Sequence, residues 1–126
     1  MAPASPMRVL VADAYPDSAD TLAMLLSLRG FDVRAVYDGN SANAELATWH
    51  PQAALLDLDL CDVPGVEVGR RARLASPKLT LIGMTGWAKR RYEAMATSSG
   101  FDFVLLKPVD ERNIVNMLLD RPQLPT

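Results

Sequence analysis

The chain has 126 residues, 49% hydrophobic and 22% charged, and a formal net charge of -2 at pH 7. These values are ordinary for one soluble globular domain, and no stretch approaches the apolar length of a membrane span. The charge balance and the lack of a basic run argue against a nucleic-acid-binding surface. The single cysteine, Cys61, excludes an internal disulfide and a cysteine metal cage. With no visible secretory signal, we expect a cytoplasmic protein.

Short apolar runs alternate with stretches of helical periodicity along the whole chain. The runs predict strands at residues 7–12, 31–36, 53–59, 79–85 and 103–106. Apolar residues at helical spacing predict helices at about 19–28, 41–48, 66–75, 88–98 and 111–119. Asp110 is the expected N-cap of the last helix, whereas Asp38 and Gly39 form a turn. Strands that alternate with helices imply right-handed crossovers and a parallel sheet covered on both faces, a three-layer α/β fold.

For two of these helices the sequence also predicts how they pack and which side chains face solvent. In the helix at 66–75 the core positions are Val66, Val68 and Leu74, and the solvated face is formed by Arg70, Arg71 and Arg73. The helix at 88–98 is polar for its length, so we expect it to dock weakly. We expect residues 1–6 to be disordered, residues 7–120 to form one domain, and residues 121–126 to be a tail or the start of a linker.

The run from Ala53 to Asp59 ends in two carboxylates one residue apart, Asp57 and Asp59. Such a run indicates a strand buried on both faces, and ligands collect outside the carboxyl ends of these strands. Asp57 taken alone could equally be a turn residue that only ends the strand. Three more predicted strands, however, are followed or closed by polar side chains that would gather at the same edge of the sheet: Asp13, Thr85 and Lys107.

This constellation suits phosphoryl chemistry. A carboxylate at the mouth of a sheet can attack a phosphoryl group and form an acyl phosphate, whose charge calls for a divalent cation with oxygen ligands. The hydroxyl of Thr85 and the ammonium of Lys107 could contact the remaining phosphoryl oxygens, although Lys107 could also be a simple counter-ion. Carboxylates about 4 Å apart repel by roughly 4 kcal/mol at an effective dielectric of 20, so such clustering is not expected to be idle.

Four motifs, in order and at near-standard spacing, resemble a known family. They are Val9-Leu10-Val11-Ala12-Asp13, Leu55-Leu56-Asp57 followed by Leu60 and Gly65, Met84-Thr85-Gly86, and Lys107-Pro108. Over about Met7 to Leu119 the chain is similar to the receiver domain of two-component response regulators. The resemblance implies a doubly wound (βα)5 fold with the flavodoxin-like strand order 2-1-3-4-5.

The resemblance also implies roles for the residues at the sheet edge. Asp57 looks like the phosphoacceptor for a histidine kinase or its phosphotransfer domain. Mg²⁺ would be held by Asp13, Asp57 and the backbone carbonyl of Asp59. Thr85 looks like the switch hydroxyl, and Lys107 looks like the lysine that pairs with phosphoryl oxygens.

The remaining implications concern the flanking loop and the partners. Gly86 and Trp87 belong to the loop beside the site, and the peptide bond before Pro108 is expected to be cis. The module would be no enzyme beyond its own phosphotransfer and autodephosphorylation. Its partners would be the kinase and a downstream effector domain or protein, without direct nucleic-acid or membrane contact, and homodimer formation stays open.

The chain departs from the family pattern at the acid site and in the switch. The second acidic residue after the first strand, usually a direct Mg²⁺ ligand, is replaced by Ala14. The aromatic switch position is occupied by Val104, with Phe103 one residue earlier, and Cys61 and Pro64 stand where the family has a proline and often an acid. We therefore expect weakened Mg²⁺ binding. We also expect that a movement of Thr85 is not transmitted to the surface by the rotation of an aromatic ring.

Two acidic side chains could in principle compensate for Ala14. Asp59 could lend its carboxylate to the metal, but alternation along a strand and the family's use of its carbonyl make this the less expected arrangement. Asp17 is a weaker candidate and is better interpreted as a helix N-cap.

Two other functions compete with a phosphorylated receiver. A pseudo-receiver would bind partners without phosphorylation through the helix at 88–98, the fifth strand and the last helix, where Tyr92, Met95 and Met117 are surface candidates. A haloacid-dehalogenase-like phosphatase also uses the first Asp of an Asp-x-Asp motif such as Asp57-Leu58-Asp59. That family, however, places the motif on its first strand and has about twice this length.

Overall fold

The computed structural model describes residues 5–87 and 89–120. The expected tail at 121–126, the first four residues of the expected disordered segment, and Ala88, the expected first residue of the fourth helix, lie outside the described residues. Among the described residues, no helix is both long and apolar enough to cross a bilayer.

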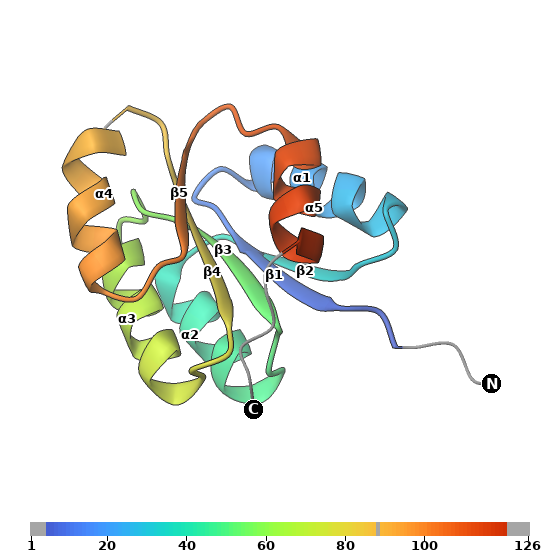
Figure 1. Ribbon diagram of the computed structural model, residues 1–126, viewed down its shortest axis with the longest axis horizontal. Helices are drawn as coiled ribbons and strands as arrows, with labels where there is room; N and C mark the ends of the chain where they lie inside the picture. Colours follow the sequence, from blue (N-terminus) through green and yellow to red (C-terminus); the bar gives the residue numbers. More distant parts are fainter. Residues whose placement is uncertain (1–4, 88, 121–126) are drawn as a thin grey trace.

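Five parallel strands form a single sheet at the centre of the molecule (Figure 1). They are β1 (Arg8–Ala12), β2 (Asp32–Val36), β3 (Ala53–Asp57), β4 (Thr80–Thr85) and β5 (Phe103–Leu106). Their order is β2-β1-β3-β4-β5, which confirms the flavodoxin-like prediction. The central strand β3 is buried along its whole length, whereas the edge strand β2 has no fully buried residue.

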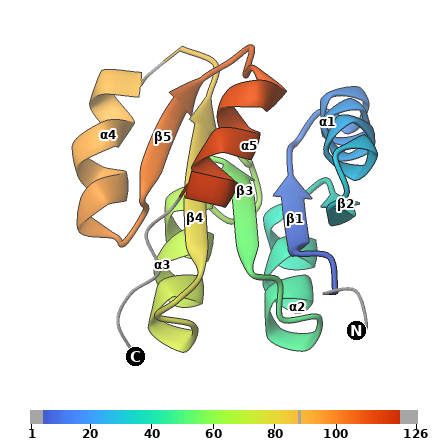
Figure 2. The same ribbon diagram turned by 45° about the vertical axis from the view of Figure 1, so that its right-hand side comes forward.

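Helices cover both faces of the sheet, and the two views in Figures 1 and 2 show the three layers. On one face lie α1 (Pro16–Leu28) and α5 (Glu111–Asp120), and on the other lie α2 (Gly39–Thr48), α3 (Gly65–Ala75) and α4 (Lys89–Ser98). The predicted doubly wound α/β architecture is therefore confirmed.

The two-residue period of a strand creates a separate core on each face. In β1, Leu10 and Ala12 belong to the cluster covered by α2, α3 and α4, which we call the first core cluster. Val9 and Val11 belong to the second core cluster, under α1 and α5. The same alternation continues in β3, so a continuous apolar run is needed to serve both faces.

Two helices start earlier than the sequence predicted. α1 begins at Pro16, because the fixed φ of proline suits the first helical position, where its missing N–H costs nothing. Asp17 therefore lies inside the first turn, and the prediction that it is an N-cap is wrong. α2 begins at Gly39, and Asp38, expected in a turn, is its N-cap, accepting the Ser41 N–H at 2.6 Å.

The surface of α3 was predicted only in part. Val68 is buried as expected, but Leu74 is 73% exposed, because Ala72 occupies the face turned to the sheet. Arg70 and Arg71 are exposed and pair with Glu67.

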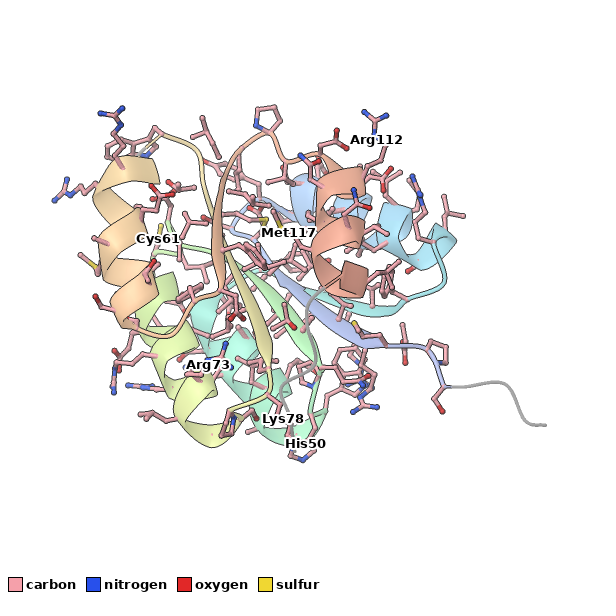
Figure 3. All side chains as sticks on the ribbon, in the orientation of Figure 1. His50, Cys61, Arg73, Lys78, Arg112 and Met117 are labelled. Carbon is pink, nitrogen blue, oxygen red and sulfur yellow. The ribbon has the colours of Figure 1, made fainter. Side chains whose placement is uncertain are left out.

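Arg73 does not belong to a solvated face, as the sequence suggested. Its guanidinium donates to the carbonyls of Gly100 and Pro77 and pairs with Asp102 at 2.9 Å. It thus joins the end of α3 to the segment before β5. Figure 3 shows Arg73 and Lys78 together in the half of the molecule that also contains His50.

α4 is thinly docked, as its polar sequence predicted. Among the residues of α4 whose side chains the structure describes, only Ala96 is fully buried. Tyr92, in the first half of the helix, is half-buried against the first core cluster, and Met95 is exposed. Met117 of α5, the other surface candidate, packs against the second core cluster (Figure 3).

Candidate functional site

The carboxyl ends of four strands bring the candidate residues together. Asp57 is the last residue of β3 and Thr85 is the last of β4, while Asp13 and Lys107 directly follow β1 and β5. The Asp57 side chain is almost fully buried, and the residue as a whole is 1% exposed. Parallel strands end at a common edge, so residues far apart in sequence meet there without any special loop.

A single ammonium group joins the two buried carboxylates. Lys107 Nζ lies 2.8 Å from Asp13 Oδ2 and 3.3 Å from Asp57 Oδ2. The peptide bond between Lys107 and Pro108 is cis, as expected. Because a cation sits between them, Asp13 and Asp57 can approach each other with their mutual repulsion offset.

Backbone N–H groups complete the surroundings of the carboxylates. Asp57 Oδ1 accepts the Asp59 N–H at 2.8 Å, and Asp57 Oδ2 accepts the Ala14 N–H at 3.3 Å. Asp13 Oδ1 accepts the Tyr15 N–H at 3.0 Å. Ala14 therefore still takes part in the site, through its backbone, although it brings no side-chain oxygen.

Burial and neighbouring charges shift the pKa values of Asp57 and Lys107. Burial raises the pKa of the Asp57 carboxyl, and the Asp59 N–H and the charge of Lys107 offset this only in part. Burial alone would lower the pKa of the Lys107 ammonium, but the carboxylates of Asp13 and Asp57 outweigh it and the pKa is raised. Lys107 therefore stays charged at neutral pH, beside a carboxylate that gains from any cation or electrophile placed on it.

Asp59 faces a different set of groups. β3 ends at Asp57 rather than at Asp59 as predicted, and the chain turns at Leu58 and Asp59, although the Leu58 N–H still donates to the Met84 carbonyl at 2.8 Å. The Asp59 carboxylate then accepts the Thr85 hydroxyl at 3.1 Å and the Gly86 N–H at 3.4 Å. It is thus directed toward the end of β4.

Sequence reasoning missed the partner of Asp59 on α4. The Tyr92 hydroxyl lies near Asp59, and its pKa is raised first by burial and then by the negative charge of Asp59. Tyr92 was expected only as a surface residue. No pattern in the sequence links the two residues, because their contact depends on where a polar helix docks.

The loop after β3 is also held by a residue that the sequence did not single out. The Asp62 carboxylate accepts the N–H groups of Gly39 and Asn40, at 2.8 and 2.9 Å, at the beginning of α2. These bonds lower the pKa of Asp62. Cys61 in the same loop is exposed, and Pro64 directly precedes α3. The path of this loop is thus defined although its usual proline and acid are absent.

The loop after β4 is open. Trp87 is 75% exposed, so its ring does not cover the acid cluster. Val104 of β5 is buried in the first core cluster, while Phe103 is partly exposed. The position of the family's aromatic switch residue is therefore occupied by a buried valine, which has no ring to turn.

The oxygen donors suited to a divalent cation are few. Asp13 and Asp57 supply carboxylates and Asp59 can supply its backbone carbonyl, whereas the side chain of Ala14 supplies none. Within residues 5–87 and 89–120, no group of three or more His, Cys, Asp or Glu side chains has the arrangement of a metal site. Hard oxygen ligands of this kind fit Mg²⁺, which keeps several water ligands, but with one carboxylate fewer than the family pattern.

The Asp57-Leu58-Asp59 motif lies on the third strand of the chain. A haloacid-dehalogenase-like phosphatase would carry it on the first strand, so the topology argues against that alternative. His50 is exposed in the loop before Pro51. In Figure 3 it lies far from Arg112, which is at the beginning of α5.

Comparisons with known proteins point in one direction. The family model described as "Response regulator receiver domain" matches residues 9–119. The transcriptional regulatory protein TrcR of Mycobacterium tuberculosis is 31% identical over 114 residues, which cover 90% of this chain and 44% of TrcR. The chain thus spans less than half the length of that relative.

Solved structures share the fold. A CheY-like response regulator receiver domain protein from Methanospirillum hungatei superposes with a TM-score of 0.88 at 24% identity, covering 93% of this chain and 94% of that one. A response regulator from Burkholderia pseudomallei, described with a phosphorylated aspartic acid, a calcium ion and citrate, has a TM-score of 0.84 at 24% identity and covers 92% of this chain and 75% of its own.

Proposed function

The chain belongs to the response regulator receiver domain family, and on this basis we propose that it accepts one phosphoryl group on Asp57 from a histidine kinase or its phosphotransfer domain. The observation that carries the proposal is the buried Asp57 carboxylate at the end of the central strand, with Lys107 shared between it and Asp13. The phosphorylated domain would then change its binding to an effector domain or protein.

The transfer needs no further acid or base from this chain. An Asp57 carboxylate oxygen attacks the phosphorus of a phosphohistidine, a P–O bond forms as the P–N bond breaks, and the leaving imidazole keeps the electron pair and takes up a proton. Lys107 offsets the negative charge that gathers between Asp57 and the incoming phosphoryl group. The backbone N–H groups of Ala14 and Asp59 hold the carboxylate in place.

Mg²⁺ is the cation that the donor set fits. Asp13, Asp57 and the carbonyl of Asp59 would hold it, and it would supply positive charge for the phosphoryl oxygens. Because Ala14 removes one carboxylate, we expect lower Mg²⁺ affinity and slower phosphotransfer than in a receiver with two adjacent acids.

The proposal is tested by titrating Mg²⁺ against Trp87 fluorescence and then adding acetyl phosphate or beryllofluoride. We expect a response that disappears in Asp57→Asn. Ala14→Asp should tighten Mg²⁺ binding about tenfold, since it restores a charged ligand, whereas Ala44→Asp on the exposed side of α2 should leave it unchanged. If neither the native protein nor Ala14→Asp responded to acetyl phosphate or to beryllofluoride, the proposed function would be wrong.

A pseudo-receiver is the second candidate, favoured by Ala14 and by the absence of a ring at Val104. Exposed apolar side chains on α4 and β5, namely Met95, Phe103 and Leu106, offer a face for a partner. Such a module would bind its partner with the same affinity whether or not Asp57 can be phosphorylated. A native protein that is silent to phosphoryl donors, together with a responsive Ala14→Asp variant, would favour this function.

A further inference from the structure

One carboxylate lies among three groups at the end of β4 and on α4. Asp59 Oδ2 accepts the hydroxyl of Thr85 and the N–H of Gly86, and the hydroxyl of Tyr92 lies close enough for the charge of Asp59 to raise its pKa. Thr85 and Gly86 lie at the end of β4, and Tyr92 lies on α4. Asp59 itself lies in the loop after β3, close to the phosphoacceptor.

These contacts conflict with the role that the proposed function gives to Thr85. A threonine hydroxyl has one proton to donate, and here it donates it to Asp59. A phosphoryl group on Asp57 would need the same proton for one of its oxygens. The Asp59 carboxylate and the phosphoryl group therefore compete for the Thr85 hydroxyl.

We propose that Asp59 is a positioning residue that holds Thr85 and Gly86 in the unphosphorylated arrangement, beside Tyr92 of α4, and releases them when Thr85 turns to the phosphoryl group. The inference rests on the proposed function. Electrostatic repulsion favours the same release, because a phosphoryl group on Asp57 brings negative charge to a site only two residues from the Asp59 carboxylate.

The release reaches the surface through α4. This helix is held mainly by Ala96 and by the half-buried Tyr92, whose hydroxyl is close enough to Asp59 for the negative charge of that carboxylate to raise its pKa, after burial. A displacement of Asp59 therefore acts on one of the few residues that dock α4. Val104 has no ring to turn, so in our proposal Tyr92 takes the part of the family's switch aromatic.

The first test needs no ligand. Amide hydrogen exchange across residues 89–98 should rise several-fold in Asp59→Ala, less in Asp59→Asn, whose amide oxygen still accepts, and also in Tyr92→Phe, which loses the hydroxyl. Asp32→Ala, an exposed aspartate on the edge strand β2, should leave exchange in α4 unchanged. Unchanged exchange in Asp59→Ala would overturn the proposal.

The second test asks whether Asp59 acts through Thr85. Asp59→Ala should tighten the apparent beryllofluoride affinity about tenfold in the presence of Mg²⁺, because a hydrogen bond to a charged group no longer has to be broken. In a Thr85→Ala background the same substitution should change it only about twofold, through charge alone. Equal gains in both backgrounds would overturn the proposal.

The two tests separate the inference from the proposed function. If Asp59→Ala weakened both Mg²⁺ binding and the beryllofluoride response, Asp59 would be a metal ligand in place of Ala14, and the positioning role would be wrong. If no variant, including Ala14→Asp, responded to beryllofluoride, the proposed function would fail. The hydrogen-exchange result would then still decide whether Asp59 anchors α4.

Discussion

Two loops flank Asp57 at the same edge of the sheet, and they are built in opposite ways. The loop after β3, residues 58–64, has two buried leucines, Leu58 and Leu60, and its Asp62 is bonded to the beginning of α2. At its end, Gly65 packs so closely on the Asp57 backbone that a Cβ there would overlap the Asp57 carbonyl oxygen and lie 2.8 Å from the Leu58 Cα. The Asp57 carboxylate thus stands on a closely packed support.

The loop after β4 has no comparable support among its described residues. Gly86 has open space where a Cβ would be, and Trp87 is exposed. Asp59, reaching across from the other loop, holds it at Thr85 and Gly86. From this difference we expect a division of labour, in which one loop holds the Asp57 carboxylate in position and the other allows the Thr85 hydroxyl to respond to a phosphoryl group.

Replacing one glycine in each loop by alanine should give the largest difference between the two loops. Gly65→Ala should lower the free energy of unfolding by about 2–4 kcal/mol, because backbone atoms of Asp57 and Leu58 would have to shift. Gly86→Ala should change it by less than about 0.5 kcal/mol, since nothing lies within 4 Å of the added carbon. Urea unfolding monitored by circular dichroism measures both.

The same pair of variants also reports on the site. Gly65→Ala moves the backbone that carries Asp57, so we expect Mg²⁺ binding to weaken with stability, whereas Gly86→Ala keeps both. Equal losses of stability in the two variants would mean that the loops do not differ in rigidity.

The residues at the strand ends of the site were largely predictable from the sequence, and the contacts made by its loops were not. Asp13, Asp57, Thr85 and Lys107 follow strands whose order and direction were predictable, and parallel strands bring their carboxyl ends to one edge. Their convergence therefore required only the alternation of strands and helices along the chain.

The contacts of Asp59 and Asp62 could not be predicted, because they depend on the path of a loop between two elements. The sequence suggested that β3 runs on to Asp59, and only the turn after Asp57 directs that carboxylate to Thr85. The start of α1 was missed for a related reason, since Pro16 suits a turn and a first helical residue equally well.

Removing the charge of Asp57 should stabilise the fixed half of the site. Burial raises the pKa of the Asp57 carboxyl above its unfolded value of about 3.9, so the folded protein binds the proton more tightly than the unfolded chain. Native stability is therefore lost as the pH rises from about 4 through the raised pKa. Asp57→Asn does not titrate, and we expect it to be more stable than the native protein by about 1 kcal/mol at pH 7.

The pH dependence provides the check on that prediction. The difference between Asp57→Asn and the native protein should be smallest near pH 4 and grow toward neutral pH, as measured by urea unfolding over this range. A variant less stable than the native protein at pH 7 would show that the charge of Lys107 more than compensates the burial of Asp57.

The smallest expected effect concerns the bond between the fixed loop and α2. The N–H groups of Gly39 and Asn40 lower the pKa of Asp62 below its unfolded value of about 3.9, so its contribution is present above that pH and is lost as the pH falls through the lowered pKa. Asp62→Asn should therefore be slightly less stable than the native protein at pH 7, and the difference should shrink below pH 4. Asp32→Asn on β2 is the matched control.

Asp62 should also affect Mg²⁺ through the loop that carries the Asp59 carbonyl. We expect a modest, about twofold loss of Mg²⁺ affinity in Asp62→Asn at pH 7, because the loop has one anchor fewer, and no loss in Asp32→Asn. If Asp62→Asn lowered stability but left Mg²⁺ affinity intact, Leu58, Leu60 and Gly65 would suffice to fix the support of the nucleophile. The bond to α2 would then serve that helix rather than the site.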